Sequence, residues 1–336
     1  MKNTNYEAMT PEEKQEFEKL VKGCCMSTTV DRFANPNDTG IYKPHIPTGF
    51  SYLDEVLGDG LVPGLHCIGA MSALGKTTFA LQMGENIARG GTPCLVFSLE
   101  MLKEDLTAKA ISRGLFVKYG PGSPVLKTAD DLMKQRIMEN LSEEEWKAIA
   151  SVKQEIKLAT DKMFVFDRRD KMRDVDTICD CVKGMVAFGG IKPVVIVDYL
   201  QFMPAMNPNM TERQKVDYNL DKLDDLAVNE QLTVVLISSV NRSSYKEEMS
   251  CQALKETGGI EYDSDTILGL QIKGAGTPNF NFNDALARCP REVEFLVLKN
   301  RYGAVAGKIQ MLYYPQYNYF EEVKKNQKNT YPHFDA

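Results

Sequence analysis

Short apolar runs alternate with amphipathic stretches along most of the chain. Helical patterns separate several of these runs, as over residues 78–88 and after the capping box Ser142–Glu145. Strands that alternate with helices predict an α/β fold with a doubly wound, mostly parallel sheet. The last two runs should close as a C-terminal β-hairpin through Tyr302 and Gly303. The expected strands lie near residues 65–69, 92–99, 163–167, 193–198, 232–240, 266–272, 291–299 and 307–315.

The two ends of the chain differ from this core. The capping box Thr10–Glu13 predicts a short N-terminal helix, and residues 24–44, rich in Asn, Thr, Pro and Gly, are typical of a linker. The last residues are polar and are expected to fray. The predicted organisation is an N-terminal helix and linker over 1–45, one large domain over 46–322 and a flexible tail over 323–336.

Composition narrows the class of protein. Of 336 residues, 43% are hydrophobic, enough for a sizeable core, and no apolar run approaches the ~20 residues that cross a bilayer. The eight cysteines and three histidines lack metal-site spacing, and the cysteines form no disulfide framework, so a reducing cytoplasm is expected. The net charge of −6 indicates no global affinity for nucleic acid, although a ring can carry a local basic lining.

Residues 70–77 (AMSALGKT) follow an apolar run and precede a helical pattern. Strand, loop and helix in this order are typical of a phosphate-binding loop (Walker A), in which backbone N–H groups cradle a nucleotide's phosphates. Lys76 would neutralise the β/γ oxygens and the Thr77 hydroxyl would bind Mg²⁺. Ala70 replaces the usual first glycine, and a chance loop is the alternative. The expected ATP-binding residues are Ala70, Ser72, Ala73, Leu74, Gly75, Lys76, Thr77 and Thr78.

Two later apolar runs end in a carboxylate. Residues 193–198 (PVVIVD) end at Asp198, the expected second metal residue beside Thr77. Residues 94–100 (CLVFSLE) end at Glu100, which is placed to polarise the water that attacks the γ-phosphate. Each carboxylate alone could be a helix cap or a loop charge, but together with the phosphate loop they favour catalysis.

Several ordered motifs resemble one known family. They are residues 48–54 (TGFSYLD), 98–101 (SLEM), 198–201 (DYLQ), 241–243 (NRS), 254–261 (LKETGGIE) with Asp263 and Asp265, 299–303 (KNRYG) and 314–320 (YPQYNYF). On these residues, the stretch from Thr48 to Phe320 resembles the RecA-like motor domain of the DnaB-type replicative helicases. The resemblance implies a RecA-like fold, ATP hydrolysis with Mg²⁺, a homo-oligomeric, hexameric ring, single-stranded DNA as partner, and a primase or helicase loader as a further partner.

The resemblance also implies roles that composition does not. The pair Lys299 and Arg301 resembles the family's trans-acting piston and arginine finger, which reach a neighbouring subunit's nucleotide; an exposed basic strand end is the alternative. The loop from Leu254 to Glu261 resembles the family's central-channel loop, which tracks DNA. Its expected DNA-binding residues are Lys255, Glu256 and Gly258.

Three departures from the family pattern stand out. Ser239 occupies the place of the family's glutamine sensor of the γ-phosphate and is too short for the same contact, so Gln201 is a candidate substitute. Lys255 replaces an arginine and offers a point charge in place of a planar fork. The family's N-terminal collar domain is missing, which resembles a phage or mobile-element helicase or a fragment of a larger chain.

The resulting hypothesis is an ATP-dependent, ring-forming DNA helicase that moves along single-stranded DNA. One alternative is a RecA-fold ATPase of the KaiC or RadA kind in signalling or recombination, which the 254–261 segment and the Lys299/Arg301 pair disfavour. The other alternative is a non-motor protein that binds nucleotide and a partner, which only Ser239 favours.

Overall fold

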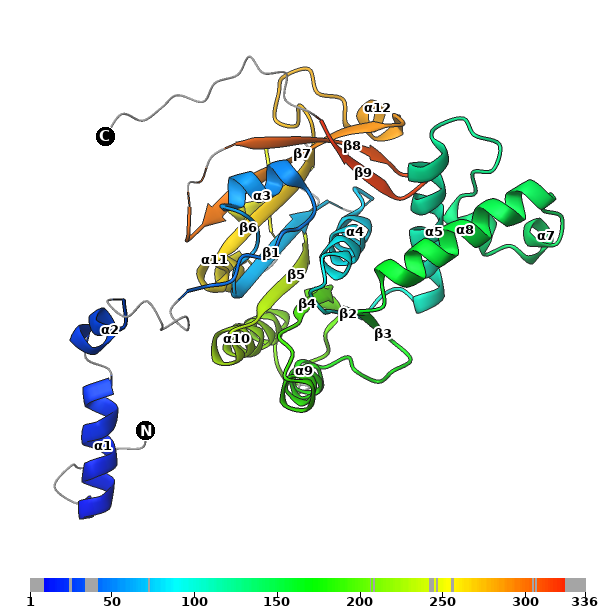
Figure 1. The fold of residues 1–336 in the computed structure, drawn as a ribbon. Helices are drawn as coiled ribbons and strands as arrows, with labels where there is room; N and C mark the ends of the chain where they lie inside the picture. The colour runs from blue at the N-terminus through cyan, green and yellow to red at the C-terminus, as the bar shows by residue number, and fades with distance from the viewer. Residues whose placement is uncertain are drawn as a thin grey trace. The chain divides into compact units, whose positions relative to one another are not determined.

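Nine strands pair into one sheet in the order β3-β2-β4-β5-β1-β6-β7-β8-β9 (Figure 1). The strands from β3 to β6 in this order are parallel, and β7, β8 and β9 join them antiparallel. The strand bounds are β1 (Gly64–Ala70), β2 (Cys94–Ser98), β3 (Met163–Asp167), β4 (Val194–Asp198), β5 (Thr233–Ser239), β6 (Thr266–Ile272), β7 (Arg291–Asn300), β8 (Lys308–Tyr314) and β9 (Tyr319–Glu322).

The computed structural model describes residues 9–23, 26–33, 42–71, 73–205, 207, 209–241, 245, 247–254, 257–303, 305 and 307–323. Its helices are α1 (Pro11–Gly23), α2 (Met26–Phe33), α3 (Ser51–Leu57), α4 (Lys76–Arg89), α5 (Lys103–Tyr119), α6 (Ala129–Leu132), α7 (Gln135–Met138), α8 (Glu143–Ala159), α9 (Val175–Gly189), α10 (Glu212–Glu230), α11 (Thr257–Asp263) and α12 (Phe282–Ala287). The 3₁₀ turns η3 (Leu200–Phe202) and η5 (Cys251–Ala253) follow β4 and precede α11. Within these ranges, no helix is long and apolar enough to cross a membrane.

The strand order explains how the helices cover both faces of the sheet. The chain moves outward from β1 through β2 to β3 and then returns through β4 and β5. Because crossovers between parallel strands are right-handed, this reversal places α4 on one face and α9 and α10 on the other (Figure 1). Every residue of β1, β4 and β6 is buried, as expected for strands covered on both sides. The prediction of a doubly wound, mostly parallel α/β fold is confirmed.

An aromatic cluster joins the parallel and antiparallel parts. Phe79 of α4 is fully buried, and its ring centroid lies 4.8 Å from that of Phe50, 4.3 Å from Phe295 of β7 and 5.4 Å from Phe320 of β9. Such offset and edge contacts add to the area that the rings bury. The cluster therefore fixes the helix that follows the phosphate loop against the last strands of the sheet.

The predicted C-terminal hairpin is present, because β7 and β8 pair antiparallel. The strand β9 was not predicted. Its four residues carry two glutamates, and a polar run this short gives little strand signal. It forms through pairing with β8, from Met311↔Glu322 to Tyr314↔Tyr319.

Contacts divide the chain into two units, Met1–Pro44 and His45–Ala336. In the first unit, α1 begins at the predicted capping box: Glu13 accepts from the Thr10 N–H at 2.8 Å, and Thr10 Oγ1 accepts from the Glu13 N–H at 3.2 Å. Within the predicted linker over 24–44, the structure has a short helix, α2. The apolar residues Met26, Val30 and Phe33 recur at helical spacing and are exposed, a signal that the turn-forming composition masked.

Candidate functional site

The phosphate loop lies between the end of β1 and the start of α4. Gly75 precedes α4 in the left-handed conformation, with φ 85°, and a Cβ there would lie 2.7 Å from the Tyr313 ring. Only glycine fits a turn that is both left-handed and pressed against a ring. The loop is thereby held at the N-terminus of α4, where the helix dipole favours an anion.

The remaining predicted cradle residues surround this turn. Ala73 has φ 66° and is exposed, whereas Leu74 and Thr78 are buried beneath the loop. Ser72 lies outside the described residues. Ala70 is the last residue of β1 and pairs with Ser239, so its methyl group points from a regular strand and not from the tight turn. This position explains why alanine can replace the usual glycine.

The Lys76 side chain folds back across the loop. Its Nζ donates to the Ala70 carbonyl at 3.1 Å and to Ser239 Oγ at 3.0 Å, and it lies 5.5 Å from the centroid of the Tyr199 ring. The ammonium group is therefore held at the carboxyl ends of β1 and β5. Ligands of open α/β sheets bind at this edge of the sheet.

Asp198 ends β4, and its carboxylate is buried beside Thr77. No hydrogen bond of standard distance and angle reaches either carboxylate oxygen from the described residues, although the Thr77 hydroxyl is close enough to act on the carboxylate. Burial raises the pKa of Asp198 to about 6, although the Thr77 hydroxyl and the cations Lys76 and Lys109 act in the opposite direction. A buried carboxylate without a partner next to a hydroxyl is a suitable oxygen pair for a hard cation such as Mg²⁺.

A cavity of about 450 Å³ opens in front of these groups. Besides the phosphate loop it is lined by Glu100, Lys109, Tyr199, Ser239 and Tyr313. Glu100 follows β2 and is exposed to this space. The structure thus brings Lys76, Thr77 and Glu100 to one cavity, at the edge where Asp198 is buried.

Lys109 was not found from the sequence. It lies on α5, where burial lowers its pKa while Asp198 and Glu100 favour its charged form. In the chain it stands between two alanines in a helix of mixed composition, so no motif identifies it. Its position at the cavity depends on how α5 packs against the sheet.

The two candidate sensor residues are joined directly. Gln201 donates from Nε2 to Ser238 Oγ at 3.0 Å and accepts from the Ser239 N–H at 3.3 Å. Ser239 in turn holds Lys76. Ser239 therefore contacts the phosphate-loop lysine, and Gln201 is hydrogen-bonded to the end of β5.

Lys299 and Arg301 lie at the opposite edge of the sheet. The register Thr266↔Asn300 places them beside the amino end of β6, whereas the phosphate loop follows the carboxyl end of β1. Lys299 Nζ donates to the Glu261 carbonyl at 2.5 Å, and Arg301 Nη2 donates to the Tyr262 carbonyl at 2.8 Å. The structure does not bring this pair to its own phosphate loop.

The candidate DNA segment is described only in part. Lys255 and Glu256 lie outside the described residues, and Gly258 lies in α11. The prediction of a loop over 254–261 was wrong at its C-terminal end, because residues from 257 onward are helical. Packing stabilises this helix although a pair of glycines favours a loop. Ile260 is fully buried, and α11 lies so close to α10 that a Cβ on Gly259 would be 2.9 Å from Leu220.

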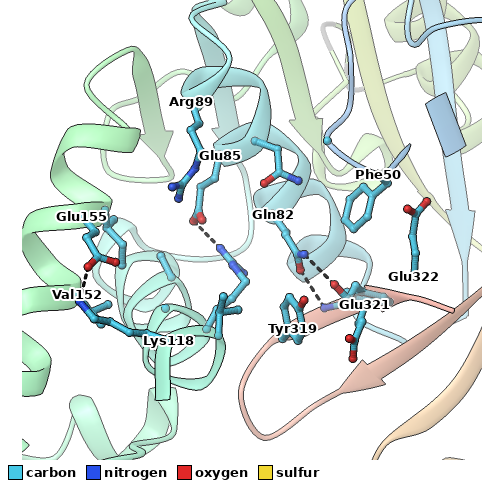
Figure 2. Close-up of a pocket in the computed structure, with 18 residues that line it drawn as sticks. Phe50, Gln82, Glu85, Arg89, Lys118, Val152, Glu155, Tyr319, Glu321 and Glu322 are labelled. Atoms are coloured by element: carbon cyan, nitrogen blue, oxygen red, sulfur yellow. Dashed lines mark hydrogen bonds and ion pairs between the residues drawn. The ribbon is translucent and has the colours of Figure 1, made fainter. Parts of the chain in front are cut away.

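A second cavity, of about 510 Å³, lies away from all these residues, between α4, α5, α8 and β9 (Figure 2). There Gln82 donates to the Phe320 carbonyl at 2.8 Å and accepts from its N–H at 2.9 Å, and Arg113 pairs with Glu85. These bonds fasten β9 and α5 to α4. The larger cavity is therefore bounded by contacts that hold β9 and α5 in place, whereas predicted site residues line the phosphate-loop cavity.

Comparisons with known proteins agree with this arrangement. The family described as DnaB-like helicase C terminal domain matches residues 45–322. The chain is 29% identical over 292 residues to the replicative DNA helicase DnaB of Haemophilus influenzae, covering 84% of this chain and 56% of the relative.

Solved structures share the fold. The ATPase domain of the protein called G40P has a TM-score of 0.70 at 20% identity, over 89% of this chain and 97% of that one. A DnaB-like replicative helicase, solved to show its interactions with primase, has a TM-score of 0.71 at 20% identity, over 89% and 67%. The chain spans between 47% and 57% of the length of the first three curated relatives it matches.

Proposed function

Because the chain belongs to the family of the DnaB-like helicase C-terminal domain, we propose that it is the ATP-driven motor of a replicative DNA helicase. Copies of the chain would assemble into a hexameric ring, hydrolyse Mg²⁺-ATP between subunits and move along single-stranded DNA. The observation that carries the proposal is the cavity in which Lys76, Thr77 and Glu100 meet at the edge that buries Asp198. We expect it to act in the cytoplasm.

Binding of ATP would use the phosphate loop and the first turn of α4. Lys76 would leave the Ser239 hydroxyl and bind the β/γ oxygens, and the backbone N–H groups around Gly75 would hold the remaining phosphate oxygens. Thr77 and Asp198 would hold Mg²⁺, which would neutralise charge on the phosphates. The unpartnered oxygens of Asp198 support this assignment.

Hydrolysis requires an activated water and a way to stabilise the charge that develops on the γ-phosphate. Glu100 is exposed to the cavity two residues after β2, and it would orient the attacking water and accept its proton. The charge of the half-buried Lys109 on α5 would favour the ionised form of Asp198 in this site.

The arginine finger would come from a neighbouring copy. The seven residues of β1 span about 20 Å at about 3.3 Å per residue, which separates Arg301 from its own phosphate loop by more than an arginine side chain can reach. If Arg301 and Lys299 contact a nucleotide, that nucleotide is bound to another subunit. Hydrolysis would then depend on assembly.

DNA would lie against the segment after Leu254. Lys255 would contact phosphates by charge, and the backbone near Glu256 and Gly258 would approach the strand closely. A helicase of similar fold is described with primase, which supports a primase as a further partner, and a helicase loader stays a prediction.

The test is the rate of ATP hydrolysis with and without single-stranded DNA, measured across protein concentration. A ring motor requires a specific rate that rises with concentration and a further stimulation by DNA. A KaiC- or RadA-like ATPase outside DNA transactions would show assembly dependence without DNA stimulation. A non-motor binding protein would bind nucleotide and show neither response.

A further inference from the structure

A buried aspartate lies behind the candidate arginine finger. Asp265 stands between α11 and β6, and its side chain is 7% exposed, whereas that of Arg301 is 49% exposed. Asp265 Oδ1 accepts from Arg301 Nη1 at 3.0 Å and from the Tyr302 hydroxyl at 3.2 Å. Oδ2 accepts from the Leu65 N–H at 3.2 Å. Both oxygens of this carboxylate are therefore used, one by the finger and one by the start of β1.

The backbone fixes the carboxylate further. The Asp265 N–H donates to the Leu65 carbonyl at 2.7 Å, and the Arg301 N–H donates to the Asp265 carbonyl at 2.9 Å. Gly64 makes room for the side chain, because a Cβ at that position would lie 2.0 Å from Oδ2. Asp265 is thus held by two strands and has little freedom to follow a moving arginine.

The C-terminus of α11 completes the support. Arg301 Nη2 and Lys299 Nζ both donate to the Tyr262 carbonyl, at 2.8 and 3.2 Å. Cations are stabilised at this end of a helix because its carbonyl groups carry partial negative charge. A guanidinium has five N–H donors, and among the described residues Arg301 uses two of them for these side-chain bonds, which leaves three that could bind an anion.

From this geometry we propose that Asp265 is a positioning residue for the neighbouring subunit's reaction: together with the last turn of α11 it presents Arg301 in one orientation. This inference rests on the proposed function, in which Arg301 acts in trans. A free surface arginine would lose rotamer freedom each time it bound a phosphate, whereas this one is ordered in advance.

A purely stabilising role explains the arrangement less well. Pairs with a half-exposed partner contribute little to stability, and a buried carboxylate is costly to desolvate. These contacts therefore favour a role for Asp265 in orienting Arg301 over a role in stabilising the fold.

The test is Asp265→Asn, which keeps the shape of the side chain and removes its charge. We expect ATP affinity to stay within about twofold of the wild type and kcat to fall about 10- to 100-fold. The reason is that the contact of Arg301 with the neighbouring subunit's nucleotide is needed only in the transition state. Mixed with Lys76→Ala subunits, the variant should regain activity, since a hybrid interface pairs an intact phosphate loop with an intact finger. A defect that acted only on the fold would not be rescued by a neighbour.

The matched control is Asp225→Asn. Asp225 is an exposed carboxylate on α10, and no hydrogen bond from it to Lys299 or Arg301 is found in the described part of the chain. Its kcat should change less than twofold. If Asp265→Asn does not fold, Tyr302→Phe removes one donor from the same carboxylate and should lower kcat about two- to fivefold with the same rescue.

The outcomes separate this inference from the proposed function. Failure of Arg301→Ala and Lys76→Ala subunits to rescue each other in mixed rings would overturn the trans mechanism itself. Rescue in that pair, combined with no rescue of Asp265→Asn or an unchanged kcat, would overturn the positioning role and leave the motor intact.

Discussion

The two edges of the parallel sheet differ in how their charged groups are satisfied. At the carboxyl edge, Asp198 is buried with no hydrogen-bond partner in the described chain, and an open cavity faces Lys76. At the amino edge, Lys299 and Arg301 are bound to backbone carbonyls and to Asp265. The carboxyl edge leaves the Asp198 carboxylate without a hydrogen-bond partner among the described residues, whereas the amino edge holds its cations in contacts with carbonyl and carboxylate oxygens. In the proposed function, the two edges would be half-sites that meet between copies of the chain.

We expect the largest loss of activity when the lysine at the carboxyl edge is removed. Lys76→Ala leaves the β/γ oxygens without a counter-charge, so we expect nucleotide binding and turnover to fall below detection. Fluorescent-nucleotide titration and an ATPase assay measure this. Retained binding with lost turnover would show that Lys76 serves catalysis alone.

The amino edge should fail in a different way. Arg301→Ala should keep its ATP affinity and lose about 10³-fold or more in kcat. In the proposed mechanism, Arg301 contacts the nucleotide bound to the neighbouring subunit and not the nucleotide bound to its own. Steady-state kinetics and nucleotide titration on the same preparation separate the two quantities. A loss of ATP affinity as large as that of Lys76→Ala would remove the distinction between the edges.

Glu100→Gln tests the proposed catalytic base at the carboxyl edge. The amide can no longer accept a proton, so we expect about a 10²- to 10³-fold loss of kcat with nucleotide binding intact. Glu104→Gln, on the exposed first turn of α5, is the matched control and should retain activity. Equal loss of ATP affinity in Glu100→Gln and Lys76→Ala would exclude Glu100 as the base.

The unpartnered carboxylate at the carboxyl edge predicts a pH dependence. Because the pKa of Asp198 is raised from 3.8 to about 6, the folded chain holds a proton between these values that the unfolded chain releases. The contribution of Asp198 to the free energy of unfolding should therefore fall as pH rises from 4 to 7, by at most about 3 kcal/mol. Denaturant titration of the wild type against Asp198→Asn measures it, and Mg²⁺ with nucleotide should offset the fall. A pH-independent difference would contradict the raised pKa.

The smallest effect is expected from the DNA segment. Lys255→Ala removes one phosphate contact per subunit, so we expect about a tenfold loss of single-strand affinity and a shallower dependence on salt. Lys157→Ala on the exposed face of α8 is the control. Wild-type affinity and salt slope in Lys255→Ala would assign DNA binding to another part of the ring.

Much of the carboxyl edge could be predicted from the sequence because its signals are local. Gly75, Lys76 and Thr77 form one motif, and buried strands that end in Asp198 and near Glu100 must bring these residues to one edge. The family resemblance and the mostly parallel α/β fold were also predicted from local motifs and hydrophobic patterns, and both are confirmed. The catalytic roles of the individual residues stay predictions.

Contacts between distant segments were not visible in the sequence. Lys109 reaches the cavity only through the packing of α5, and α11 forms where a loop was expected because α10 covers Ile260. Strand β9 exists through its pairing with β8. In each case the local preference is weak, so the neighbouring element decides.

The sequence by itself determined the phosphate loop, the strand-end carboxylates and the order of the core elements, since these follow from hydrophobic period and from residues close in the chain. Only the tertiary structure decided that Arg301 stands at the opposite edge and that Asp265 holds it. Arg301 and Asp265 are 36 residues apart, and Asp265 and Leu65 are 200 apart. Such contacts depend on strand order and register, which no local pattern encodes.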